Sequence, residues 1–432
     1  MGDRTMNDFF KLSARGTDVK TEVIAGFTTF LTMAYIVIVN PAILSAAGVP
    51  FNQVFIATVI SAVVGTLIMA LWANYPIAIA PGMGMNAYFV SVVFSEGVTY
   101  QAVLGTVFFA GVIFLLLTFT SLRETLIRSI PTPLKVGVAS GIGLFIASLG
   151  LKMSGIIVPD EETFVTFGDI TSPVTLLTVF GVLLSLILVT REVKGALFIG
   201  MLVTAVIGYV TGLLYIDNGF VSTPPSPVFF DLDLSSVFSQ SLYSVVFAFL
   251  LVTLFDTTGT MIGVAEQAGL MKDGELPGAK RALMADAVAT TVGATFGSTP
   301  SSAYVESSSG VQVGGRTGLT TLVVAVLFML TLFFSPIIES ISALSAITAP
   351  ALIIVGSFMM SGLSKVNWSR FDDAFPTFII ILSMPFTSSI ATGIALGFIT
   401  YPLLKLVVGR GKEVHPLIYV FAVLFIIQIG FL

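Results

Sequence analysis

Cysteine is absent from this chain of 432 residues, and histidine occurs once, at His415. Disulfide bonds and thiolate metal sites are therefore excluded, and a single histidine gives no cluster for zinc or haem. The sequence also contains neither an HExxH segment nor a Walker A segment, so it predicts no metalloprotease site and no direct coupling to ATP. We expect no cofactor and no enzyme activity.

Charged residues are scarce. Only 10% of the residues are charged, whereas soluble domains contain about 25%. Hydrophobic residues make up 56%, and the mean hydropathy is +1.02. A transmembrane helix needs about 20 apolar residues, and runs of that kind occupy nearly the whole chain. The composition therefore predicts an all-α polytopic membrane protein without a large soluble domain.

Fourteen transmembrane segments are predicted from these runs. They cover residues 22–46, 53–73, 76–95, 100–120, 133–151, 172–190, 194–214, 242–265, 280–297, 300–314, 318–338, 344–363, 371–387 and 389–408. With the N-terminus inside, 18 of the 19 Lys and Arg residues fall on the inner side, and only Lys152 falls outside. This bias predicts the orientation of the chain, with a cytoplasmic N-terminus. The apolar residues 414–431 are either a fifteenth segment or an interfacial one.

Seven segments followed by seven more suggest an internal repeat. The stretch YPIAIAPGMGMNAY (75–88) resembles residues 297–304 and the helix after them, since both are short, extended and broken by Pro and Gly. In the same order, PTP at 131–133 parallels TAP at 348–350. Because seven is odd, the two halves cross the membrane in opposite senses, which is the inverted-repeat design of secondary transporters.

Two carboxylates lie in apolar, membrane-length surroundings. Asp256 lies within FDTTGT (255–260), and Glu306 ends GSTPSSAYVE (297–306). A charged side chain at the centre of a bilayer costs at least about 2.5 kcal/mol, so it usually faces a polar site. The second stretch also breaks its helix at a depth where only protein or a water-filled cavity can satisfy the backbone. We predict that Asp256 and Glu306 face one substrate cavity.

Two interrupted helices are expected to bring polar groups to this cavity. One helix is predicted to begin near Met83 and the other near Pro300, a favoured first helical residue. Each start would point unpaired N–H groups and a positive dipole end toward the middle of the membrane. Asn86 and Glu306 lie about one turn inside these two starts.

The eighth segment presents a small, polar face around Asp256. Gly259, Thr260 and Gly263 share that face at helical spacing. Tight helix packing is expected at Gly263, but packing does not explain Asp256. A carboxylate in a dry cavity can exchange a proton as the cavity opens and closes, or accept paired N–H donors from a ligand. Glu306 could do either, so the sequence does not say which of the two carboxylates carries the proton.

The motifs around these residues resemble the nucleobase/ascorbate transporter (xanthine/uracil permease) superfamily, and specifically its AzgA-like branch of adenine, guanine and hypoxanthine permeases. The resemblance runs to about residue 408 through AGFTTFLTMAY (25–35), APGMGMNAYF (80–89), FDTTGTMIGVAEQAGL (255–270) and GSTPSSAYVESSSGVQVGGRTGL (297–319). It implies fourteen transmembrane segments as two inverted 7-helix repeats, with discontinuous segments 3 and 10 whose short β-stretches meet at the substrate.

A division into a core and a gate domain is also implied by the resemblance. The expected parts are a cytoplasmic N-terminus (1–21), the core domain (22–120 and 242–338), the gate domain (121–241 and 339–408) and a C-terminal apolar segment (409–432). Members of the family are often dimeric through the gate domain, so a homodimer is expected. The expected location is the bacterial cytoplasmic (inner) membrane.

The function implied by the resemblance is secondary active import of purine nucleobases (hypoxanthine, guanine, adenine) by proton symport and alternating access. The expected partners are a purine base, protons and the lipid bilayer, with no nucleic acid. The family's substrate-binding positions fall on Asp256, Glu306 and Asn86. Uracil or xanthine relatives usually have Glu in place of Asp256. Further candidates for substrate contact are Tyr35, Met85, Thr260, Ser302, Ala303 and Tyr304.

The sequence also leaves other functions open. On the same fold, these are a uracil/xanthine permease and an anion transporter. Two carboxylates oppose an anion, and no Lys or Arg is expected in their cavity. A channel suits two interrupted helices less well than alternating access does. An intramembrane aspartyl protease would need the carboxyl groups of Asp256 and Glu306 within about 3 Å of each other.

Overall fold

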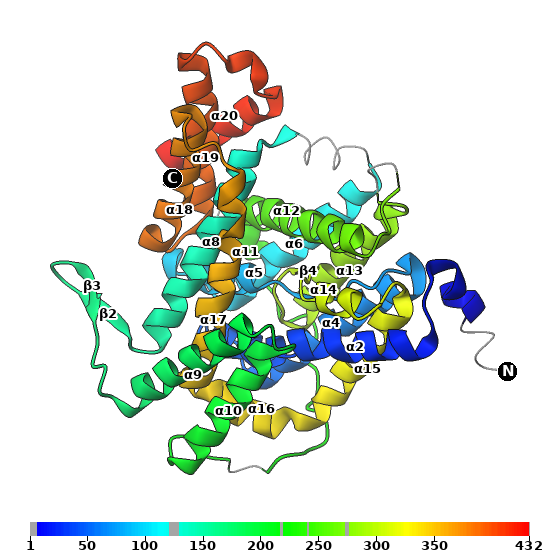
Figure 1. Ribbon diagram of the computed structural model, residues 1–432. Coiled ribbons are helices and arrows are strands. Elements are labelled where there is room, and N and C mark those ends of the chain that lie inside the picture. The colour runs from blue at the N-terminus through cyan, green and yellow to red at the C-terminus, as the bar shows by residue number, and fades with distance from the viewer. Residues whose placement is uncertain (1–6, 121–128, 217–218, 240–241, 273–275, 432) are drawn as a thin grey trace.

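The computed structural model describes residues 7–120, 129–216, 219–239, 242–272 and 276–431, and helices dominate it (Figure 1). Three of the basic residues predicted to lie inside, Arg4, Arg123 and Arg128, fall outside the described residues. The helices are α2 (Val19–Met33), α3 (Ile36–Ser45), α4 (Phe51–Ile68), α5 (Met83–Ser95), α6 (Tyr100–Thr118), α8 (Thr132–Met153), α9 (Pro173–Thr190), α10 (Ala196–Val210), α11 (Leu234–Ser239), α12 (Tyr243–Gln267), α13 (Ala279–Phe296), α14 (Ser307–Gln312), α15 (Gly318–Thr331), α16 (Ser335–Ala343), α17 (Ser345–Met359), α18 (Phe371–Thr387), α19 (Ile390–Val407) and α20 (Pro416–Phe431).

Within the described residues, nine helical stretches are long and apolar enough to cross a membrane. They are Val19–Ser45, Phe51–Ala73, Tyr100–Thr118, Thr132–Met153, Pro173–Thr190, Tyr243–Gln267, Gly318–Ala343, Ser345–Lys365 and Ile390–Val407. The other five predicted segments correspond to α5, α10, α13, α14 and α18. The prediction of an all-α polytopic fold is confirmed, and the elements agree with fourteen segments in two inverted repeats.

In the described parts of the chain, four short strands form two antiparallel pairs. One pair, β2 (Ile157–Asp160) and β3 (Phe164–Phe167), lies in the connector between α8 and α9. The other joins the two halves of the chain, because β1 (Ile79–Pro81) pairs with β4 (Ser301–Ala303). This pair confirms the β-stretches predicted in segments 3 and 10, and Figure 1 shows β4 near the centre of the molecule.

The helices pack in two groups. Helices α2 to α6 pack with α12 to α15, while α8 to α10 pack with α17 to α19. In Figure 1, α8 and α17 run side by side, at a steep angle to α12 and α2. Contacts between the groups include α5 with α8, α10 with α2 and α12 with α19. The first group contains both β1 and β4.

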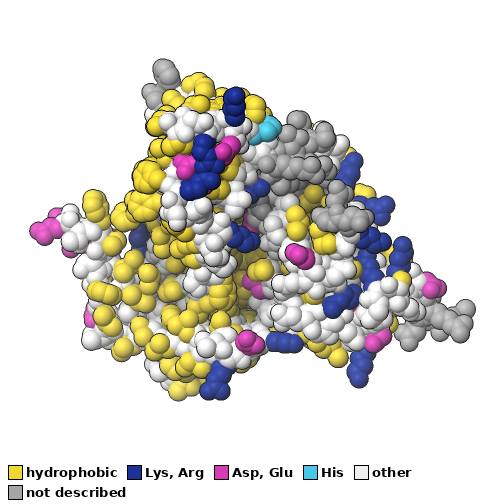
Figure 2. Space-filling view, turned by 45° about the horizontal axis from the view of Figure 1, so that its top comes forward, with side chains coloured by type: hydrophobic (Ala, Val, Ile, Leu, Met, Phe, Trp, Pro, Cys, Tyr) yellow, Lys and Arg dark blue, Asp and Glu magenta, His cyan; other side chains and the backbone are white. Residues whose placement is uncertain are grey.

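The outer surface matches a lipid environment. Large hydrophobic side chains are exposed on many helices, among them Leu183 and Ile187 of α9 and Leu424 and Ile427 of α20. Figure 2 shows hydrophobic side chains gathered on the left of one face, and Lys and Arg concentrated on its right. The predicted apolar segment 414–431 forms α20, whose Phe421 and Phe425 pack against Phe398 of α19.

Hydroxyl groups from neighbouring helices complete the backbone hydrogen bonds of β1 and β4. Thr66 of α4 donates to the carbonyl oxygen of Ile79 (2.9 Å) and accepts from its N–H (3.1 Å). On the other strand, the N–H of Ser301 donates to the hydroxyl of Thr290 (3.0 Å). The hydroxyls of Ser61 and Ser301 lie 2.6 Å apart. Because lipid cannot supply such partners, these bonds stabilise extended backbone inside the membrane.

The buried Glu22 joins α2 to the start of α15. Its carboxylate accepts from the backbone N–H groups of Arg316 (2.8 Å), Thr317 (3.3 Å) and Thr320 (3.1 Å). A carboxylate at a helix N-terminus is stabilised by the free N–H groups and by the helix dipole. The contact fixes α2 against the segment that follows α14.

Lys405 is one of the basic residues that the sequence places on the inner side of the membrane, and the structure shows that it is buried. It lies in α19 with only 1% of its surface exposed. Its ammonium group contacts the carboxylates of Asp372 (2.6 Å) and Asp373 (2.7 Å) at the start of α18. A buried charge is tolerated when it is paired in this way, and these partners lie more than 30 residues away in the sequence.

We predict that replacing Thr66 by Val lowers thermal stability. The variant keeps the shape of the side chain but leaves both the N–H and the carbonyl of Ile79 without the hydroxyl, which costs about 1–3 kcal/mol. The measurement is thermal unfolding of the purified protein in detergent. Thr106→Val is the matched control, because Thr106 is equally buried and its hydroxyl bonds only to Val103 of its own helix. Equal melting temperatures for the two variants would contradict the prediction.

Candidate functional site

The first transmembrane segment is broken where it reaches the centre of the molecule. Helix α2 ends at Met33, α3 begins at Ile36, and Tyr35 lies at the break. The hydroxyl of Tyr35 donates a hydrogen bond of 2.6 Å to the carboxylate of Glu306. The hydroxyl of Thr32 donates to the backbone carbonyl of Glu306 (3.3 Å). Two segments far apart in sequence therefore meet at Glu306.

Glu306 lies just before α14 rather than one turn inside it. The prediction of a helix start near Pro300 was wrong, because residues 301–303 form β4 and α14 begins at Ser307. The backbone pairs with β1 instead of forming a helix, and this pairing continues as the N–H of Tyr304 donates to the carbonyl of Ala78 (3.0 Å). The other start, near Met83, agrees with α5.

Asp256 lies near the middle of the continuous helix α12. The neighbouring Thr257 donates to the carboxylate of Asp286 on α13 (2.7 Å), and both side chains are fully buried. This bond holds the turn of α12 that carries Asp256.

One cavity of about 100 Å³ brings most of the candidate residues together, and we name it the acidic cavity. The candidates that line it are Tyr35, Asp256, Thr260, Ser302, Ala303, Tyr304 and Glu306. Val355 and Met359 of α17 also line it, so the acidic cavity lies where the two helix groups meet.

The charges in the acidic cavity are close together. The carboxylates of Asp256 and Glu306 are near enough to repel each other when both are ionised. Ser302 lies close enough to Asp256 to donate a hydrogen bond to it. The hydroxyl of Tyr304 is directed elsewhere, since it donates to the carbonyl of Pro81 (2.5 Å). The cavity therefore offers mainly acceptors, together with the hydroxyls of Thr260 and Ser302.

Asn86 and Met85 lie outside the acidic cavity. Asn86 is fully buried, and its amide oxygen accepts a hydrogen bond from the hydroxyl of Thr299. Its amide nitrogen has no hydrogen-bond partner among the described residues. Met85 lines a second cavity that also contains Asp256. Asn86 thus connects α5 to the residues just before β4.

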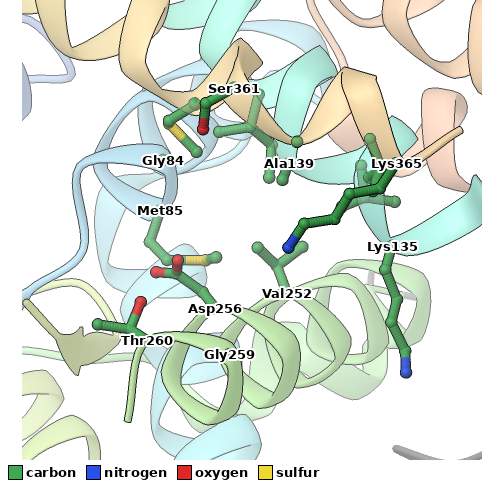
Figure 3. Close-up of a pocket in the computed structure, with 15 residues that line it drawn as sticks. Gly84, Met85, Lys135, Ala139, Val252, Asp256, Gly259, Thr260, Ser361 and Lys365 are labelled. Atoms are coloured by element: carbon green, nitrogen blue, oxygen red, sulfur yellow. The ribbon is translucent and has the colours of Figure 1, made fainter. Parts of the chain in front are cut away.

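The second cavity, which we name the vestibule, has a volume of about 330 Å³. It shares Gly84, Asp256, Thr260 and Met359 with the acidic cavity. Figure 3 shows Asp256 rising from α12 on one side and Lys365 reaching in from the opposite side. The two cavities therefore border each other at Asp256.

Two lysines line the vestibule that the sequence did not predict to lie near Asp256. Lys135, in the first turn of α8, and Lys365, at the end of the short helix Met360–Lys365, both line it. The expectation of no Lys or Arg holds for the acidic cavity but was wrong for the vestibule. Both lysines follow the ordinary pattern of inner-surface anchors, so no local signal separates them from the other basic residues.

The tight packing predicted at Gly263 was also wrong. A Cβ atom built at Gly259 or Gly263 would meet no other atom within 4 Å. Gly259 instead lines the vestibule beside Asp256. In the part of the chain that the structure describes, these glycines therefore leave room on the polar face of α12.

Comparison with known proteins shows that nearly the whole chain is similar to permeases. The permease family matches residues 20–396. A guanine/hypoxanthine permease of Bacillus subtilis, PbuO, is 56% identical over 430 residues, which cover 97% of this chain and 99% of the relative. An adenine permease of Escherichia coli, AdeP, is 44% identical over 435 residues, covering 100% of this chain and 97% of the relative.

The fold is shared with a solved transporter. The transmembrane domain of the cyanobacterial bicarbonate transporter BicA superposes with a TM-score of 0.66 at 17% identity, covering 88% of this chain and 97% of that chain. At this identity the likeness shows the fold alone. The permease family and the permease relatives identify a membrane transporter and not an enzyme. The chain belongs to the permease family, within the AzgA-like branch of the nucleobase/ascorbate transporters.

Proposed function

We propose that this protein imports purine nucleobases (hypoxanthine, guanine and adenine) by proton symport. The observation that carries the proposal is the acidic cavity, where Asp256 and Glu306 meet in the centre of a membrane protein. The relatives named as guanine/hypoxanthine and adenine permeases, similar over nearly their whole length, support the same substrate class.

Recognition of the base follows from the groups in the acidic cavity. A purine ring carries N–H donors and ring-nitrogen or carbonyl acceptors along its edge. The carboxylates of Asp256 and Glu306 accept from the donors, and the hydroxyls of Thr260 and Ser302 can donate to the acceptors. The backbone of Ala303 and the rings of Tyr35 and Tyr304 enclose the base.

Asn86 is proposed to act on the base through Thr299. Its hydrogen bond to the hydroxyl of Thr299 fixes the backbone just before β4, and so the position of Ser302. Met85 lies on the adjoining wall of the vestibule and would contact a base as it enters or leaves the acidic cavity. Both residues thus remain part of the proposed binding site.

The structure favours Asp256 over Glu306 as the proton carrier. Glu306 already accepts a hydrogen bond from Tyr35, and such a bond favours the ionised carboxylate. Asp256 lines both the acidic cavity and the vestibule, whereas Glu306 lines only the first, so a proton carried by Asp256 could pass between the two cavities. Two carboxylates that repel each other are accommodated together more easily when one carries a proton.

We propose that transport proceeds by alternating access between the two helix groups. The first group would be the core domain that carries the base, and the second the gate domain. Asp256 and Glu306 belong to the first group, while Met359 on the cavity wall belongs to the second. Relative movement of the groups would open the cavity to either side. We further propose a homodimer through the gate domain, located in the bacterial inner membrane with the N-terminus in the cytoplasm.

Replacing Asp256 by Ala should abolish uptake of hypoxanthine while leaving membrane insertion intact. The reason is loss of both the acceptor for the base and the proposed proton carrier. The measurement is uptake of radiolabelled hypoxanthine by cells that lack their own purine permeases, with the amount of protein in the membrane determined in parallel. Glu266→Gln is the control, because Glu266 is an exposed carboxylate on the same helix. Uptake at the wild-type rate in Asp256→Ala would disprove the assignment.

The two carboxylates should differ in their effect on proton coupling. In proteoliposomes, Glu306→Gln is expected to weaken base binding about tenfold, as loss of a charged hydrogen-bond acceptor does, but to keep stimulation by an inward proton gradient. Residual transport by Asp256→Asn should no longer respond to the gradient. The measurement is uptake with and without an uncoupler. A gradient response that persists in Asp256→Asn and is lost in Glu306→Gln would reverse the assignment.

A panel of competitors distinguishes the purine proposal from its alternatives. Unlabelled hypoxanthine, guanine and adenine should inhibit uptake of labelled hypoxanthine, whereas uracil, sulfate and bicarbonate at the same concentration should not. A cavity with two carboxylates disfavours the two anions, and the relatives named as guanine/hypoxanthine and adenine permeases support purines over uracil. Inhibition by uracil as strong as that by guanine would support a uracil/xanthine permease instead.

A further inference from the structure

The acidic cavity and the vestibule meet at a rim that four residues form. Among the described residues, those that line both cavities are Gly84, Asp256, Thr260 and Met359. The first three belong to α5 and α12 of the first helix group, and only Met359, at the end of α17, belongs to the second. A molecule that moves from one cavity to the other therefore has to pass Met359.

Met359 is also the flexible member of this rim. Gly84 has no side chain, and the side chains of Asp256 and Thr260 are short. The side chain of Met359 is long, unbranched and able to change its rotamer at little cost. It is only partly buried, against the hydrophobic core, so it has room to move. One rotamer can therefore fill the passage between the two cavities and another can leave it open.

The backbone of Met359 is held by α8, so that the side chain moves from a fixed base. The hydroxyl of Ser140 donates to the carbonyl of Met359 (3.5 Å). The two helices also approach closely at Gly143, where an added Cβ atom would lie 2.7 Å from the Cβ atom of Met359. Within the span Ser345–Lys365, the α-helix ends at Met359 and a 3-10 helix follows. Such a change inside a helix often marks a hinge.

We propose that the side chain of Met359 is the inner gate of the acidic cavity, which closes it toward the vestibule or opens it for a base to leave. Figure 3 shows Lys365 on the opposite side of the vestibule from Asp256, and the distribution of positive charges predicts that this end is cytoplasmic. Because Met359 belongs to the second helix group, relative movement of the two groups also changes the width of the passage. The inference rests on the proposed function in taking the acidic cavity as the site of the base, but its test needs no transport.

The test uses single engineered cysteines, since the chain contains none of its own. Ser302→Cys places a thiol in the acidic cavity, and Ser361→Cys places one in the vestibule. The measurement is the rate at which a cationic, membrane-impermeant methanethiosulfonate labels each thiol in inverted membrane vesicles, where it arrives from the cytoplasmic side. We expect fast labelling of Ser361→Cys and slow labelling of Ser302→Cys. Adding Met359→Ala should speed the labelling of Ser302→Cys at least about tenfold, because a protected group reacts only when its surroundings open.

Two controls should leave the slow labelling of Ser302→Cys unchanged. Met359→Leu keeps the volume of the side chain, and Val355→Ala shortens a residue that lines the acidic cavity but not the vestibule. An unchanged rate with Met359→Ala, an equal acceleration by Val355→Ala, or no labelling of Ser361→Cys from the inner side would each overturn the inference. Hypoxanthine should slow the labelling of Ser302→Cys in the Met359→Ala background, and its failure to do so would instead contradict the proposed function.

Discussion

Backbone groups in the middle of a membrane must find hydrogen-bond partners inside the protein, and the rest of this structure depends on how β1 and β4 meet that requirement. Each strand supplies partners to the other, and hydroxyls from α4, α13 and Tyr304 supply further ones. The strands end where α5 and α14 begin. One small pair of strands therefore fixes two helix starts and the polar residues near them.

The sequence was sufficient to predict the features that follow from composition and local chemistry. Low charge and long apolar runs predicted the membrane class, and Pro81 and Gly82 predicted the interruption before α5. Asp256 and Glu306 could be singled out because a carboxylate in hydrocarbon is costly without a site. The structure places both on one cavity, although they belong to elements 50 residues apart by their numbers.

Other features depend on tertiary contacts that local patterns do not contain. Pro300 is a good first residue of a helix, but pairing with β1 keeps the next three residues extended. Gly263 belongs to a small-residue face typical of close packing, yet a Cβ atom there would meet nothing within 4 Å among the described residues. Lys405 is buried because two carboxylates of α18 lie beside it, and Lys365 enters the vestibule because its short helix ends there. For Pro300 and Lys405, partners distant in sequence decide the outcome.

The strand β4 and the helix α12 differ in how many changes of sequence they tolerate. Successive side chains of β4 alternate in direction, so Ser301 reaches Ser61 of α4 while Ser302 lines the acidic cavity. Inserting or deleting one residue in this strand would exchange those roles and disrupt the backbone contacts at once. Gly259, by contrast, faces open space, and a larger residue there would narrow the vestibule without displacing any neighbour. Substitutions on α12 can therefore change the size of the cavity at little cost to folding. The pairing of β1 with β4, in contrast, tolerates no insertion or deletion.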